Sequence, residues 1–126
     1  MLMQKLILLS GTVLMGLSVA IGAFGAHALK DMLEASQRTD TFNTAVSYQV
    51  YHSLALLLIG TLMYKIPSKF LEYAAWSHLA GILLFSGSLY ILCLSGQAKW
   101  GAVTPLGGLS FIVGWVLLFF GISKSI

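Results

Sequence analysis

The chain has 126 residues, of which 58% are hydrophobic and 9% are charged, and its net charge is +3. A soluble domain usually has about a quarter charged residues, so this composition excludes an ordinary water-soluble fold and indicates a protein dissolved in lipid. The few, scattered positive charges also exclude a nucleic-acid surface. We therefore predict one all-α domain, residues 1–126, folded as an integral membrane four-helix bundle.

A helix that crosses a membrane needs about twenty mostly apolar residues. Four stretches meet this requirement, at about residues 6–29, 44–64, 73–94 and 103–122. The polar stretch between the first two places Leu29, Met32 and Leu33 on one helical face, which predicts a short amphipathic helix on the membrane surface. Thr39 or Asp40 is then expected to cap the second span.

The first span also has features of a secretory signal, because Lys5 precedes it and Ala26-His27-Ala28 has the small-x-small form of a cleavage site. Its apolar run is longer than signal peptides usually have, so we expect a membrane span. Four crossings place both termini on one side, together with Lys65, Lys69 and Lys124. The positive-inside rule then predicts that both termini lie in the cytoplasm.

Small residues recur at helical spacing in three of the four spans. Lipid provides no hydrophobic drive between helices, so close backbone approach is expected to hold the bundle together. The expected packing glycines are Gly22 and Gly25 in the first span, Gly81 in the third, and Gly107, Gly114 and Gly121 in the fourth. They predict tight internal packing, with a dimerisation surface as the alternative.

The second span carries the most polar side chains at membrane depth. One face is expected to hold Thr41, Thr44, Ala45, Tyr48, Tyr51, His52 and Ala55. Because unpaired polar groups are costly in hydrocarbon, we expect this face to point into the bundle. His52 is expected near the bilayer centre and His78 at another depth. The histidines then join neighbouring helices by hydrogen bonds, which we favour; the alternatives are a proton relay and a hydrogen-bonding site for a lipid head group or quinone.

We expect no metal or cofactor, because a metal site needs several ligands at one depth. The single Cys93 lies in an apolar run and is expected to be a small buried side chain. No nucleophile–base pair or carboxylate dyad is apparent, so no catalytic residue is predicted.

Four blocks of sequence, in order, resemble a known family. They are Gly22 to Leu29; Phe42 to Leu56, with Tyr48-Gln49 and Tyr51-His52-Ser53; Leu84 to Tyr90; and Thr104-Pro105-Leu106-Gly107-Gly108. The chain resembles the YgdD/YwdK-type small membrane proteins, a domain of unknown function with relatives in eukaryotes. The resemblance implies four transmembrane helices in the bacterial cytoplasmic membrane and no agreed activity. It adds a candidate polar cluster of His27, Thr44, Tyr48, Tyr51, His52, Ser86 and Thr104.

These observations favour a non-enzymatic membrane component that binds lipid or partner proteins. The alternative is a small transporter or channel that uses the polar face of Tyr48 and His52. Membrane lipids are the expected partners, and a homo-oligomer remains an alternative.

Overall fold

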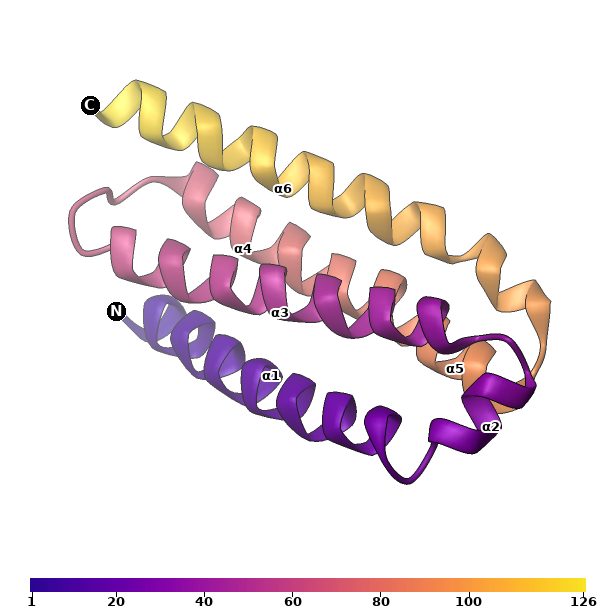
Figure 1. The fold of residues 1–126 in the computed structure, drawn as a ribbon. Helices are drawn as coiled ribbons and strands as arrows, with labels where there is room; N and C mark the ends of the chain where they lie inside the picture. Colours follow the sequence, from indigo (N-terminus) through magenta and orange to yellow (C-terminus); the bar gives the residue numbers. More distant parts are fainter.

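The computed structural model describes all residues 1–126 and contains four apolar helices long enough to cross a membrane (Figure 1). The all-α prediction is confirmed. The elements are α1 (Leu2–Ala26), α2 (Lys30–Ala35), α3 (Thr39–Leu62), α4 (Lys69–Gly81), the π-helical turn η1 (Ile82–Ser86), α5 (Gly87–Ser95), the 3₁₀ turn η2 (Ala98–Ala102) and α6 (Thr104–Ser125). The continuous stretch from α4 to α5 is the third crossing.

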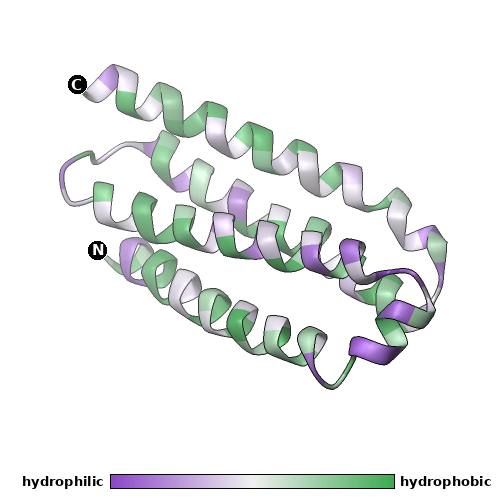
Figure 2. Ribbon diagram, in the orientation of Figure 1, coloured by the Kyte–Doolittle hydropathy of each residue, from purple (hydrophilic) through white to green (hydrophobic).

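The crossings pack in the order α1, α3, α4 and α6, so α1 and α6 lie on opposite outer sides (Figure 1). The crossings alternate in direction, which makes α3 and α6 parallel and brings both termini to one end of the bundle. The main core contains Ile7, Leu56, Leu71 and Phe111, one from each crossing. Apolar residues dominate all four crossings, whereas the polar residues concentrate at the bundle ends and on α2 (Figure 2).

Glycines make the close contacts between helices. Gly107 on α6 lies against the backbone of Phe85, and Gly114 lies against the ring of His78. On α4, Gly81 contacts the Phe111 ring. The other glycines expected to pack also face side chains of neighbouring helices: Gly121 faces Leu71, Gly25 faces Phe42, and Gly22 faces Val46. The close approach therefore lies within the molecule, between α1 and α3 and between the third crossing and α6.

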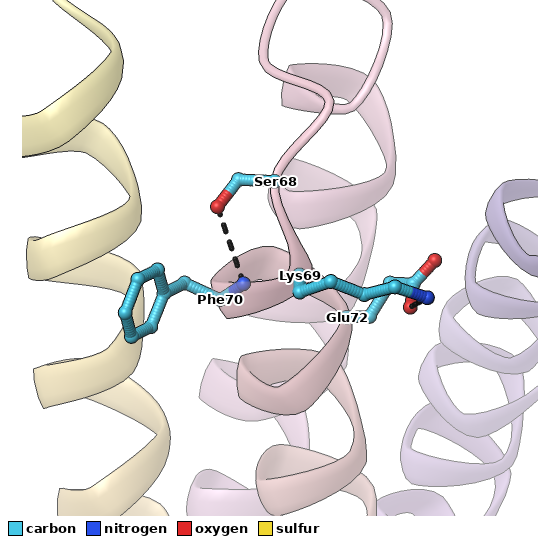
Figure 3. Close-up of polar contacts among 4 residues, drawn as sticks. All are labelled: Ser68, Lys69, Phe70 and Glu72. Atoms are coloured by element: carbon cyan, nitrogen blue, oxygen red, sulfur yellow. Dashed lines mark hydrogen bonds and ion pairs between the residues drawn. The ribbon is translucent and has the colours of Figure 1, made fainter.

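The third crossing begins at Lys69, earlier than the predicted Tyr73. Ser68 is its N-cap, and the serine hydroxyl accepts a hydrogen bond from the Phe70 N–H at 3.2 Å (Figure 3). An N-cap supplies a partner that the first turn of a helix lacks. Lys69 and Glu72 pair at 2.9 Å on the exposed side of this turn. The cap therefore allows the helix to begin with the polar residues Lys69 and Glu72, which a prediction from hydropathy alone excludes from the span.

A π-helical turn interrupts the third crossing at its middle. The Gly87 N–H donates to the carbonyl of Ile82, five residues back rather than four. One extra residue in the turn rotates α5 relative to α4, so the two halves present different faces. Ser86, inside the turn, donates a 2.7 Å hydrogen bond to the carbonyl of Ala45 on α3.

The predicted surface helix is α2, and Leu33 on its inner face is buried against Phe42 and Cys93. Cys93 is thus a small buried side chain, as expected. The predicted cap of α3 was wrong, because Thr39 and Asp40 lie inside the first turn and neither caps it. The preceding residue, Arg38, instead donates to carbonyls at the end of α5, at 3.3 and 3.5 Å.

Candidate functional site

A groove of about 460 Å³ runs between α3 and α6, with the π-helical turn at its base. We call it the α3–α6 groove. Its lining consists of Tyr48, Tyr51, His52, Phe85, Gly108, Phe111, Ile112 and Trp115. Grooves of this size accommodate small organic ligands. It is the place where polar and aromatic side chains meet at membrane depth.

His52 joins the two walls of the groove. Its Nδ1 lies 2.8 Å from the carbonyl oxygen of Tyr48, and its Nε2 lies 3.1 Å from the indole nitrogen of Trp115. A carbonyl only accepts and an indole N–H only donates, so Nδ1 carries the proton and Nε2 accepts. This assignment makes the imidazole neutral, with both nitrogens paired. His52 therefore links α3 to α6 by a hydrogen bond.

His78 lies behind this pair, on α4, and is completely buried at 0% exposure. Its Nδ1 lies 2.7 Å from the carbonyl oxygen of Ala74 and carries the proton for the same reason. Its Nε2 has no hydrogen-bond partner in the chain. Its ring is 5.4 Å from that of His52 and 4.7 Å from that of Trp115, measured between centroids.

The expectation that His52 and His78 lie at different depths was therefore wrong. The third crossing begins at Lys69, so His78 lies deeper in the membrane than a start at Tyr73 implied. The end of α3 at Leu62 lies on the same side of the bundle as Lys69, and His52 is about as far from Leu62 as His78 is from Lys69. The two imidazoles meet, although no group of three metal-binding side chains surrounds them.

Stacked rings form the base and sides of the groove. The imidazole of His52 stacks on Phe111, with centroids 3.5 Å apart and planes 9° apart. Tyr48 stacks on Phe85, with centroids 4.4 Å apart and planes 25° apart. Stacked aromatic rings have few rotatable bonds and hold a flat wall in place. The groove is consequently shaped by rigid rings.

The tyrosines face outward, contrary to expectation. Tyr51 is 57% exposed and Tyr48 is 38% exposed, and Thr44 on the same side is also exposed. Only the Ala45, His52 and Ala55 part of the predicted face is buried. The reason is that α3 contacts α1 on one side and α4 on the other. Its buried arc therefore centres on smaller residues and leaves the tyrosines at the edge.

The other members of the predicted cluster lie elsewhere. His27 is exposed at the end of α1. Ser86 is buried against α3, and the Thr104 hydroxyl shares a 2.6 Å hydrogen bond with that of Ser88. These contacts join neighbouring helices. The structure brings together Tyr48, Tyr51 and His52 from the predicted cluster and adds His78 and Trp115.

Gln49 is a buried polar residue that the sequence reasoning did not single out. Its amide nitrogen donates to the carbonyl of Leu14 on α1 at 2.8 Å, and its amide oxygen accepts from the Tyr90 hydroxyl at 2.5 Å. Gln49 therefore connects α1, α3 and α5. A glutamine in the middle of an apolar span is the signal that could have identified it, since such a side chain needs partners in hydrocarbon.

Four apolar crossings joined by glycine contacts and interhelical hydrogen bonds define a multi-pass integral membrane protein. Residues 21–108 match the family model described as "Protein of unknown function (DUF423)". The chain belongs to this family, as the sequence resemblance indicated.

Named relatives match over most of the chain. It is 40% identical to the UPF0382 membrane protein SH2409 of Staphylococcus haemolyticus, over 98% of this chain and 99% of the relative. It is 38% identical to the UPF0382 membrane protein YwdK of Bacillus subtilis, over 91% and 94%. It is 41% identical to the UPF0382 inner membrane protein YgdD of Escherichia coli, over 82% and 78%. No solved structure matches the chain.

Proposed function

We propose that the protein is a non-enzymatic membrane component that binds a lipid-soluble molecule in the α3–α6 groove. The observation that carries this proposal is the position of the two tyrosine hydroxyls. Neither the Tyr48 nor the Tyr51 hydroxyl takes part in a hydrogen bond within the chain. Both side chains line the groove and are open to the surrounding lipid.

Depth makes these hydroxyls costly in the absence of a partner. Tyr51 lies near the middle of α3, about 18 Å from its start at 1.5 Å per residue. The hydrocarbon core is about 30 Å thick and provides no water there. A hydroxyl left unpaired in such surroundings costs several kcal/mol. A bound molecule with hydrogen-bonding groups would remove this cost.

The distribution of polar groups supports binding over transport. Beyond Ser53, the second half of α3 is apolar apart from Thr61, whose hydroxyl donates to the Leu57 carbonyl of its own helix. Polar side chains along a transport path would be expected to continue through the membrane. The polar side chains that line the groove therefore stop about halfway along α3.

The positions of the acids support a non-enzymatic role. Glu72 lies beside Lys69 near one bundle end, and Asp31, Glu34 and Asp40 lie on α2 or the first turn of α3 at the other. No carboxylate lines the groove. Its one imidazole, that of His52, is held by a carbonyl and an indole, and no serine or cysteine lines the groove beside it.

We also propose that the protein lies in the bacterial cytoplasmic membrane with both termini in the cytoplasm. The end that holds the termini carries four lysines and one acid: Lys5, Lys65, Lys69, Lys124 and Glu72. The other end carries three cations and three acids: Lys30, Arg38, Lys99, Asp31, Glu34 and Asp40. Lysine and arginine favour the cytoplasmic side, where anionic lipids would also attract them.

Labelling of single cysteines tests this orientation. In a Cys93→Ser background, Pro67→Cys places an exposed thiol in the loop between α3 and α4, and Gln97→Cys places one in the loop after α5, at the opposite end of the bundle. A membrane-impermeant maleimide should label intact spheroplasts only at position 97. Labelling only at position 67 would show that the orientation is the reverse.

Native mass spectrometry of the full chain, released from nanodiscs made with total membrane lipid, tests the binding proposal. Gly108→Leu should fill the groove, because a Cβ at this position meets Phe85 at an ordinary 3.8 Å. Gly16→Leu is the matched control, since nothing lies within 4 Å of a Cβ there. We expect the wild type and Gly16→Leu to retain a small molecule that Gly108→Leu loses. Equal retention by all three proteins, or none by any, would contradict the proposal.

A further inference from the structure

We propose that the molecule bound in the α3–α6 groove is an isoprenoid quinone, held by its ring. This inference rests on the proposed binding function and specifies the chemical class of the ligand. The groove combines aromatic walls, two free hydroxyl donors and a position within the membrane-spanning part of α3, with Tyr51 near the midpoint of that helix. These three properties together select a flat ring that carries carbonyl groups and dissolves in hydrocarbon.

Depth excludes most membrane lipids. The head group of a phospholipid lies about 15 Å from the bilayer centre, half the thickness of the hydrocarbon core. Tyr51 is near the midpoint of α3, so its hydroxyl cannot reach such a head group unless the lipid leaves its leaflet position. A quinone ring has no charge and can enter the hydrocarbon region completely. It can therefore bring polar atoms to this depth.

The shape of the walls favours a planar ring. The Phe111 and His52 rings cover each other with planes 9° apart, and both are buried. The Tyr48 ring stacks on Phe85 with planes 25° apart and is partly exposed, so it offers a ring face to a ligand. Aromatic faces pack best on another flat ring in an offset arrangement. The side of the groove at Tyr51 and Ile112 is open to lipid, with exposures of 57% and 62%. An isoprenoid tail can leave the groove on this side and remain among the acyl chains.

The hydrogen-bonding groups match carbonyl acceptors. The only acceptor nitrogen of His52 is already taken by Trp115, and its N–H is taken by the Tyr48 carbonyl. The groups left free to bind are the two phenol O–H donors of Tyr48 and Tyr51. Quinone carbonyls accept hydrogen bonds and offer no donor of their own. The assigned contacts are therefore tyrosine O–H to quinone oxygen.

Fluorescence quenching of Trp115 tests the assignment, because quinones quench indole emission at contact. The full chain with Trp76→Phe and Trp100→Phe keeps Trp115 as the only indole. Decylubiquinone is titrated into dimyristoyl phosphatidylcholine nanodiscs that contain this protein. A second variant, Trp100→Phe with Trp115→Phe, keeps only Trp76, which lines a different groove between α1 and α4. It reports collisional quenching by quinone free in the membrane.

We expect saturable quenching of Trp115 and only linear quenching of Trp76. Tyr51→Phe and Tyr48→Phe should each raise the half-saturation concentration of decylubiquinone about fivefold, since a neutral hydrogen bond contributes about 1 kcal/mol. Tyr73→Phe, an exposed tyrosine on α4 outside the groove, should leave it unchanged. Circular dichroism of each variant confirms that the fold is kept.

Linear quenching of Trp115 would overturn the quinone assignment. Mass spectrometry would then separate the two claims: another lipid that Gly108→Leu releases leaves the binding function standing, whereas no bound molecule refutes both. Saturable quenching that neither tyrosine variant changes would overturn the assigned contacts.

Discussion

Gly107→Ala should destabilise the protein by forcing α6 away from the π-helical turn. A Cβ at position 107 would lie 2.7 Å from the Cα and Cβ of Phe85, with the Phe85 backbone nitrogen closer still. Carbon atoms pack best at about 3.5–4.0 Å. The helices must therefore separate by about 1 Å. The obstacle is mainly backbone, so a change of side-chain rotamer cannot relieve it.

The separation reaches beyond one residue. Gly114 and Gly121 on the same helix lie against His78 and Leu71, so a shift of α6 loosens these contacts as well. Overpacking of this kind costs about 1–3 kcal/mol. Alanine returns up to about 1 kcal/mol through its higher helix propensity. We expect a net destabilisation of about 0–2 kcal/mol relative to the wild type, and of about 1–3 kcal/mol relative to a glycine-to-alanine change at an unconstrained helical site.

Gly16→Ala is the matched control, because a Cβ at position 16 meets nothing within 4 Å. It should be neutral or stabilising by up to about 1 kcal/mol. Both variants can be unfolded by increasing the mole fraction of dodecyl sulfate in mild detergent micelles, followed by circular dichroism. If their stabilities agree within about 0.5 kcal/mol, the spread typical of unconstrained surface sites, the argument from close packing is wrong.

Three further variants can be measured in the same unfolding assay. Gln49→Leu removes hydrogen bonds to α1 and to the Tyr90 hydroxyl and should cost about 1–3 kcal/mol, with much of this loss shared with Tyr90→Phe in a double-mutant cycle. Gly96→Ala should cost about 1 kcal/mol because Gly96 has φ +73°, and Gly96→Asn should cost less. Arg38→Met keeps an apolar stem but releases the carbonyls at the end of α5, and should cost about 0.5–1.5 kcal/mol.

Each of these predictions has a result that contradicts it. Additive losses in Gln49→Leu and Tyr90→Phe would show that the two side chains act independently. Equal costs for alanine and asparagine at position 96 would remove the left-handed backbone as the cause. A fully stable Arg38→Met would show that water or lipid head groups replace the arginine without loss.

The number and type of the crossings could be predicted, because hydrophobic length decides whether a helix spans a bilayer. The start of the third crossing could not, because it depends on the Ser68 cap rather than on hydropathy. The error was four residues, about 6 Å along a helix, and it separated His52 from His78 in the prediction. A correct helix start would have placed the two histidines together.

The orientation of the second crossing was harder to predict for a different reason. The prediction turned polar side chains inward, whereas α3 packs mainly through small and apolar residues such as Ala45, Ser53 and Ile59. Tyr51 was left at the lipid surface despite its hydroxyl. The π-helical turn adds a second difficulty, because a fixed 100° per residue fails across Ile82–Ser86. The Tyr90 partner of Gln49 lies beyond that turn.

The packing order of the crossings has a consequence for biogenesis. Each later crossing has a neighbour that is synthesised before it: α3 packs on α1, the third crossing packs on α3, and α6 packs on α4 and the π-helical turn. Chains emerge from the ribosome from the N-terminus, so every new helix finds a neighbour already in the bilayer. The third crossing contacts α6 more extensively than α3, so its packing is complete only when the last helix arrives.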